Sequence, residues 1–257
     1  MLKRILHFAY GLGAYVLFLG TFLYALAFIG GCPILPNRLD GPLTGSLGSA
    51  IAVNCALLAA FAVQHSVMAR PWFKARWTQM IPWSIERSTY VLASSLALIL
   101  LFWLWRPIGV EIWSVENPVG QAVLWALFAL GWGTVLVSTF LINHFDLFGL
   151  RQVTLPLLGK PYTPVSFRTP WLYRQVRHPL YVGWLLAFWA TPHMTLAHFL
   201  FAVATTAYIL IAIQFEERDL VAEHGEAYAD YRRRVPMLIP GAKLRRREVV
   251  QPASDYT

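Results

Sequence analysis

The chain has 257 residues, of which 57% are hydrophobic and only 13% charged, and this ratio excludes an ordinary soluble globular protein. Two cysteines, Cys32 and Cys55, are too few for a disulfide scaffold or a multi-cysteine zinc site, so we expect no metal ion. The formal net charge of +8 would indicate nucleic acid in a soluble protein, but in a membrane protein its meaning depends on which side of the membrane carries the charges.

Four segments without Asp, Glu, Lys or Arg are long enough, at about 1.5 Å per residue, to cross about 30 Å of hydrocarbon. They cover approximately residues 8–29, 46–68, 88–105 and 119–142. The first is too long and too rich in leucine and aromatic residues for a signal peptide, so we expect a retained helix.

The last apolar segment, residues 178–215, would be about 57 Å long as one helix, which is too long for a bilayer. Pro192 supplies a break, so we expect a short arm over about 180–190 and a full span over about 195–215. The predicted fold is all-α and integral to the membrane. It has five full transmembrane helices plus a shorter hairpin arm, with a cytoplasmic cap and a C-terminal tail, and it divides into residues 1–142 and 143–257.

The positive charges predict the orientation of these helices. Alternating the loops across the membrane places 19 of the 21 lysines and arginines on one face, and only Arg38 and Arg106 on the other. By the positive-inside rule, both termini are expected in the cytoplasm. The charge is thus mainly a topology signal, although the arginine triplets 232–234 and 245–247 could also contact anionic headgroups, and no nucleic-acid partner is expected.

Polar residues gather at the expected cytoplasmic ends of the helices. Four clusters lie at this depth, at residues 64–66, 143–146, 177–179 and 216–219, and the proline-punctuated segment 147–176 joins two of them. They jointly predict a polar, capped pocket at the membrane interface, although each residue taken alone is more typical of a helix anchor. A transporter would instead carry ionisable residues near mid-membrane, where this chain has none.

The C-terminal part of the chain contains four motifs in close succession: VRHPLYVG at 176–183, EERDL at 216–220, HGEAYADYRRRVP at 224–236 and IP at 239–240. In this order and spacing they resemble the isoprenylcysteine carboxyl methyltransferase superfamily. The upstream segments QHSVMARP at 64–71 and NHFDLFGLRQ at 143–152 look like the bacterial methanethiol S-methyltransferase branch of that superfamily.

The resemblance implies an enzyme that uses S-adenosyl-L-methionine, bound in region 143–257. Matched residue by residue, it implies cofactor contacts from Tyr173, His178, Pro179, Leu180, Tyr181 and Glu216, with backbone contacts from Phe167 and Arg168. The chain departs from the family pattern at two positions. Val165 replaces a histidine near the cofactor, and Ala212 replaces an arginine that binds the substrate, which argues against a carboxylate on the acceptor.

A thiol acceptor must be deprotonated, because few alkanethiols ionise at neutral pH. His144 with Asp146 is the first candidate pair for a base, although residues two apart on a helix do not share a face, so their contact requires an unwound turn. His65 and Arg151 are second candidates, the arginine as a fixed positive charge beside the thiolate. Structural roles are equally compatible with each of the four.

The resemblance therefore predicts in-line methyl transfer from S-adenosyl-L-methionine to methanethiol, giving dimethyl sulfide, in the bacterial inner membrane. A small volatile thiol and membrane lipid are the expected partners, with no obligate protein partner. Alternatives are a methyltransferase for another small thiol or a lipid-linked acceptor, a small-molecule transporter, and a structural subunit without cofactor affinity.

Overall fold

The computed structural model describes residues 1–242, and five of its helices are long and apolar enough to cross a membrane. These are α1 (Leu2–Ile29), α2 (Leu47–Ala69), α4 (Trp83–Leu104), α5 (Pro118–Ile142) and α10 (Leu196–His224). The chain is an all-α integral membrane protein, as the apolar segments predict. The triplet 245–247 and the last part of region 143–257 lie outside the described residues.

A short apolar helix, α9 (Pro179–Trp189), precedes α10 and forms the predicted hairpin with it. The break between them contains strand β2 (His193–Thr195), which pairs antiparallel with β1 (Glu111–Ser114). The sequence analysis did not predict this pair, because strands of three or four residues are too short to give a period-two pattern.

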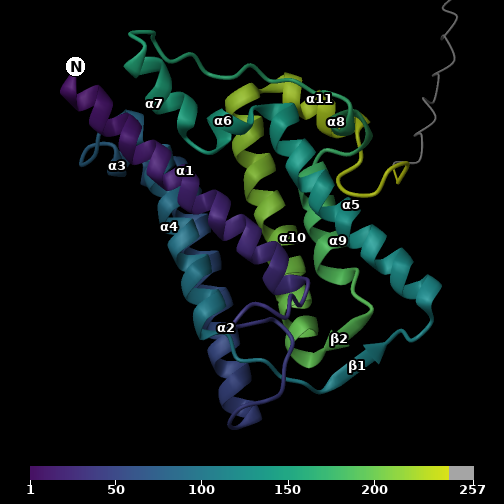
Figure 1. Cartoon of the computed structure of the whole chain (residues 1–257). Helices are drawn as coiled ribbons and strands as arrows, with labels where there is room; N and C mark the ends of the chain where they lie inside the picture. The colour runs from purple at the N-terminus through teal and green to yellow at the C-terminus, as the bar shows by residue number, and fades with distance from the viewer. Residues whose placement is uncertain (243–257) are drawn as a thin grey trace, which may run out of the picture.

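The remaining helices are short and gather with the N-terminus at one end of the bundle (Figure 1). They are α3 (Pro71–Trp77), α6 (His144–Leu147), α7 (Leu150–Leu157), α8 (Leu172–Gln175) and α11 (Glu226–Arg234). We call this the capped end, and the opposite end, which carries β1 and β2, the strand end. The segment 147–176 lies across the capped end, where the sequence predicts a cap.

Several long helices continue beyond their apolar segments at the capped end. α1 begins at Leu2, α4 begins at Trp83 and α10 ends at His224, whereas hydropathy alone suggested about 8, 88 and 215. Hydropathy marks the hydrocarbon boundary, while the helical backbone runs on into the polar interface because charged side chains there do not interrupt its hydrogen bonds.

Three helices start at the strand end with side-chain caps. Ser46 Oγ accepts from the amide of Ser49 at the start of α2, and Thr195 Oγ1 accepts from the amide of His198 at the start of α10. Asn117 caps α5 in the same way, directly before Pro118. These residues satisfy amides that the first helical turn leaves unpaired, which fixes where each helix begins.

The strand end is closed by buried polar contacts. The Asp40 carboxylate accepts from Thr195 Oγ1 at 2.5 Å and lies 3.1 Å from His198 Nδ1, and His198 Nε2 is 3.0 Å from the Phe188 carbonyl. His198 is 1% exposed, and these contacts give it a structural role. Asn54 likewise binds the backbone of Arg106 through both of its amide atoms.

Helices α5 and α9 meet at two glycines. A Cβ at Gly131 would lie 2.6 Å from the Ala187 nitrogen, and one at Gly183 would lie 2.7 Å from the Gly131 carbonyl oxygen. Both distances are shorter than any tolerated carbon contact, so only glycine permits this approach. The contact fixes α9 against the middle of α5.

Candidate active site

Two buried polar side chains, Arg177 and His178, directly precede Pro179, where α9 begins. Both contact one carboxylate of α10: Arg177 Nε donates to Glu217 Oε1 at 2.6 Å, and His178 Nε2 lies 3.0 Å from the same oxygen. Glu217 is 6% exposed. A buried carboxylate needs paired positive charge, so these three side chains form a structural clasp between α9 and α10.

The chain after α11 is fastened to this clasp. Arg177 Nη1 donates to the carbonyls of Arg232 and Val235, at 3.1 and 2.6 Å. The Arg177 and His178 amides donate to the carbonyls of Pro236 and Met237, at 2.8 and 3.2 Å. The segment 232–237 therefore covers the start of α9, as expected for a tail that closes the site.

Glu216 points to a different environment from its neighbour Glu217. Tyr181 Oη donates to Glu216 Oε2 at 2.9 Å, and His178 Nδ1 lies 3.9 Å from the same oxygen. The Glu216 side chain is 42% exposed, so its carboxylate retains lone pairs for further donors. The structure thus brings together three of the residues that the resemblance assigns to the cofactor: His178, Tyr181 and Glu216.

Tyr173 joins the same group from α8. Its hydroxyl donates to the Ser138 carbonyl at 3.4 Å, and its own carbonyl accepts from Tyr231 Oη at 2.6 Å. Burial raises the pKa of Tyr231 to about 12 and raises that of Tyr173 further, so both hydroxyls stay protonated donors. Ser138 Oγ is buried beside them and has no hydrogen-bond partner within residues 1–242.

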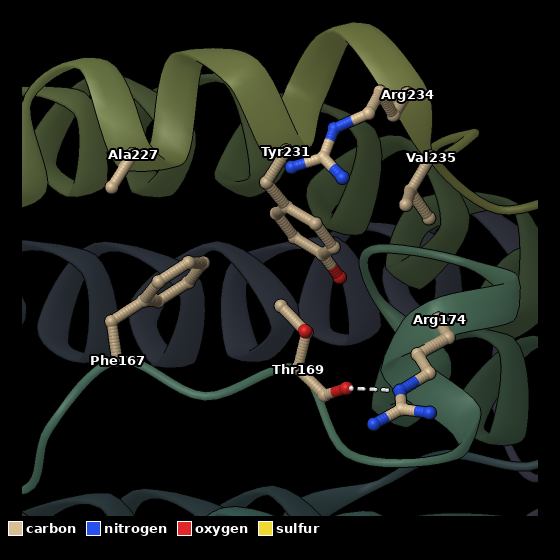
Figure 2. A pocket seen from close by; sticks show the side chains of 7 residues that line it. All are labelled: Phe167, Thr169, Arg174, Ala227, Tyr231, Arg234 and Val235. Carbon is tan, nitrogen blue, oxygen red and sulfur yellow. Dashed lines mark hydrogen bonds between the residues drawn. The ribbon is translucent and has the colours of Figure 1, made fainter.

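A cavity of about 350 Å³ lies between segment 167–174 and α11 (Figure 2). It is lined by Phe167, Thr169, Arg174, Ala227, Tyr231, Arg234 and Val235. The Phe167 ring packs on Tyr228 and Tyr231 with centroids 5.7 and 5.6 Å apart, while Arg174 Nε donates to the Thr169 carbonyl, the dashed bond in Figure 2. The volume is in the range of small-ligand sites. Of the two residues expected to present backbone to the cofactor, Phe167 lines this cavity and Arg168 contacts Ser166 at the surface.

The side chains gathered here fit a cofactor that has a positive charge, hydroxyl groups and an aromatic base. Glu216 supplies an anionic acceptor, and Tyr173 and Tyr181 supply aromatic rings. Ser138 Oγ is a buried polar atom without a partner among the described residues. Within residues 1–242, no group of three or more His, Cys, Asp or Glu is arranged to hold a metal ion.

His144 is buried, and hydrogen bonds occupy both of its nitrogens. Thr139 Oγ1 donates to the Leu136 carbonyl, so it must accept from His144 Nδ1 at 2.9 Å. His144 Nε2 then carries the lone pair and accepts from Tyr15 Oη at 2.9 Å. Burial lowers the pKa of His144, which keeps the ring neutral, and the Phe140 ring stacks on it at 4.3 Å.

Asp146 does not share a hydrogen bond with His144. The turn between α5 and α6 is unwound at Asn143, as their contact would require, but the two side chains diverge. Asp146 pairs with Arg151 at 3.1 Å and accepts from Tyr162 Oη at 3.3 Å. Arg151 also donates to Thr163 twice, at 2.7 Å, so Asp146 and Arg151 anchor the segment after α7 rather than orient the imidazole.

His65 lies in the last turns of α2. Its Nε2 is 2.8 Å from Tyr90 Oη and its Nδ1 is 3.1 Å from Ser94 Oγ, while the neighbouring Ser66 Oγ donates to Tyr208 Oη at 3.2 Å. Sequence reasoning missed Tyr90 and Tyr208, because each lies in a long apolar span. What the sequence offered was a tyrosine hydroxyl within each of these apolar spans, near the depth of the polar cluster that ends a neighbouring span.

Comparison with known proteins places the chain among curated relatives. Methanethiol S-methyltransferase from Crocosphaera subtropica is 60% identical over 239 residues, which are 93% of this chain and 93% of that protein. Methanethiol S-methyltransferase from Mycobacterium tuberculosis is 56% identical over 93% of this chain and 98% of its own. Nurim from Danio rerio is 30% identical over 68% of this chain and 66% of its own. No protein-family model and no solved structure matches the chain.

Proposed function

The chain belongs to the methanethiol S-methyltransferase family, and from this membership we propose that it methylates methanethiol to dimethyl sulfide with S-adenosyl-L-methionine as the methyl donor. It is a methyltransferase and a multi-pass membrane protein. The observation that carries the proposal is Glu216, a partly exposed carboxylate held by Tyr181 beside His178, at helix ends that the covering tail encloses.

The cofactor supplies an electrophilic methyl group on a sulfonium. Glu216 accepts hydrogen bonds from its amino group or ribose hydroxyls, and the rings of Tyr173 and Tyr181 contact the sulfonium or the adenine. Pro179 and Leu180 start α9, so the positive end of this helix favours a carboxylate there. Holding the acceptor sulfur in line, about 3–3.5 Å from the methyl carbon, then provides much of the rate enhancement.

A small apolar thiol suits the acceptor side. Ala212 provides no positive charge for an acceptor carboxylate, and the surrounding spans are apolar, so the thiol can enter from lipid. A thiolate that attacks a sulfonium cancels charge, so a site of low dielectric favours the reaction. We place the site on the cytoplasmic side of the bacterial inner membrane, because most of the positive side chains lie at the capped end.

His65 is the histidine that we propose as the base. His144 has both nitrogens engaged with Tyr15 and Thr139 in an aromatic shell, whereas the tyrosine bonded to His65 lies near Tyr181 and thus near Glu216. Asp146 and Arg151 act in the proposal by holding the segment over the site.

The direct test is an assay of the purified full chain in detergent or vesicles. With isotopically labelled cofactor and methanethiol, we expect labelled dimethyl sulfide in the headspace and one equivalent of demethylated cofactor. Parallel reactions with ethanethiol, hydrogen sulfide and a prenylated cysteine define the acceptor. Methylation of one of these but not of methanethiol would reject the proposed substrate, and absence of cofactor binding would reject the proposed function.

A further inference from the structure

A polar cluster joins α2 to α4 at the capped end, outside the residues assigned to the cofactor. It consists of His65, Tyr90 and Ser94, with Tyr90 Oη at 2.8 Å from His65 Nε2 and Ser94 Oγ at 3.1 Å from His65 Nδ1. Gln64 Nε2 also donates to Ser94 Oγ, whereas Gln64 Oε1 is buried and has no partner within residues 1–242. Polar side chains are costly to bury inside apolar spans, so a cluster of them indicates a functional site.

Tyrosines link this cluster to Glu216. Tyr181, which donates to Glu216, is close enough to interact electrostatically with both Tyr208 and Tyr90. Tyr208 interacts in the same way with Glu216 and accepts a hydrogen bond from Ser66, the residue after His65. Hydroxyls from α9 and α10 thus lie beside the carboxylate proposed to hold the cofactor, and the Tyr90 hydroxyl of α4 lies near these two tyrosines.

The surroundings of His65 favour a neutral ring with one available lone pair. Phe61 stacks on the imidazole with centroids 5.2 Å apart. Tyr90 Oη lies 2.8 Å from Nε2 and 3.1 Å from Nδ1. With hydrogen on Nδ1, which the ring donates to Ser94 Oγ, only Nε2 can accept the Tyr90 proton. Of the neighbouring cations, Arg70 pairs with Asp219 at 2.9 Å, whereas Arg87 lies over the Tyr90 ring at 5.9 Å and its buried Nε has no hydrogen-bond partner within residues 1–242.

We propose that Tyr90 is a catalytic residue that contacts the acceptor thiol and relays its proton to His65; this inference rests on the proposed thiol methylation. The thiol S–H proton passes to Tyr90 Oη as the Tyr90 proton passes to His65 Nε2. The thiol sulfur forms the new bond to the methyl carbon, and the sulfonium sulfur keeps the electron pair of the bond that breaks. The positive charge moves from the sulfonium to the imidazole, which later releases the proton to water.

A second tyrosine–histidine pair provides a matched control. Tyr15 Oη lies 2.9 Å from His144 Nε2, with an angle of 87° between the two rings where Tyr90 and His65 have 39°. The ring neighbours of Tyr15 are Phe18, His144 and Phe145. Tyr15→Phe and Tyr90→Phe therefore remove the same hydroxyl from the same kind of hydrogen bond. If the pairs only stabilise the fold, the two variants should behave alike.

The experiment compares Tyr90→Phe, His65→Gln and Tyr15→Phe as full-length proteins, each checked for folding and for cofactor affinity. We expect Tyr90→Phe and His65→Gln to lower kcat for methanethiol by about 100-fold or more, as loss of acid–base catalysis does, with cofactor affinity within twofold of wild type. Tyr15→Phe should keep kcat within about threefold.

A second acceptor separates catalysis from structure. With a more acidic thiol such as thiophenol or trifluoroethanethiol, which is largely ionised at pH 8, the defects of Tyr90→Phe and His65→Gln should shrink at least tenfold, because no proton relay is needed. Equal defects with both acceptors, or equal kcat for Tyr90→Phe and Tyr15→Phe, would overturn the relay. Wild-type protein that binds no cofactor would instead contradict the proposed function.

Discussion

The two ends of the bundle treat buried polar groups differently. At the strand end, Asp40, Thr195 and His198 satisfy one another and the Phe188 carbonyl. At the capped end, Gln64 Oε1 and Ser138 Oγ are buried without partners, and none of the unpaired buried side-chain atoms within residues 1–242 lies at the strand end. The complete network holds the helices together, while the incomplete one leaves groups that a ligand can satisfy.

The same contrast recurs within the capped end. Glu217 is buried and paired with Arg177 and His178, whereas Glu216 is partly exposed and bound by Tyr181. Adjacent residues on one helix point about 100° apart, so one carboxylate faces the packed interior and the other faces the site. This distinction separates stability from binding, and each variant below tests one side of it.

The largest expected effect is that of Glu217→Ala. Removal of the carboxylate leaves the buried Arg177 guanidinium without its ion-pair partner, which typically costs about 3–5 kcal/mol. The free energy of unfolding in mixed micelles should fall by this amount, and segment 232–237 should become sensitive to protease. A loss below about 1 kcal/mol would show that the clasp does not hold the fold together.

Glu216→Ala is the matched change one residue away. We expect a loss of about 1.5–3 kcal/mol in cofactor affinity, because hydrogen bonds to a charged group are lost, with little change in unfolding free energy. Isothermal titration with the demethylated cofactor product measures the affinity. Unchanged affinity would remove Glu216 from the site, and a stability loss equal to that of Glu217→Ala would erase the contrast.

At the strand end, Asp40→Ala leaves His198 Nδ1 and Thr195 Oγ1 without their acceptor. Buried polar groups that lose a partner cost about 1–3 kcal/mol, so thermal unfolding should shift downward. Because this network is remote from Glu216, kcat and cofactor affinity measured below the unfolding transition should match wild type. A selective loss of cofactor affinity would show that the two ends are coupled.

The smallest effect concerns pH and His144. Burial lowers the pKa of His144 below the ordinary value of about 6.5, so the unfolded chain binds this proton at a higher pH than the folded chain. Stability from this group is present above pH 6.5 and is lost as pH falls below it. Between pH 7.5 and 5, the unfolding temperature should fall further in wild type than in His144→Gln. Equal falls would mean that His144 does not carry this dependence.

The sequence predicts the fold correctly where one physical cause dominates. Lack of charge over the length of a bilayer identified the five spans, and the excessive length of 178–215, with Pro192, required the hairpin. It failed where side-chain direction decides. Nothing in the order of residues distinguishes Glu216 from Glu217, and the His144–Asp146 contact did not form because Arg151 and Tyr162 bind Asp146 after the chain folds back.

The acceptor side was harder to predict than the cofactor side for a similar reason. Cofactor residues follow one another in short motifs, so a resemblance locates them. Tyr90 and Tyr208 come from two spans far apart in the sequence and approach Tyr181 only in the assembled bundle. Their hydroxyls carry no charge and do not disturb hydropathy.

The contact between Gly131 and Gly183 limits which helices of the enzyme can move relative to one another. Two backbones that lack room for one methyl group cannot slide past each other, so α5 and α9 must move as a single rigid body. Any opening that admits a thiol must then occur elsewhere, between this body and the α2–α4 pair. Next to the α2–α4 pair, α10 is joined to α2 by the Ser66–Tyr208 hydrogen bond and to Arg70, directly after α2, by the Arg70–Asp219 ion pair. These side-chain contacts can break and re-form with each turnover.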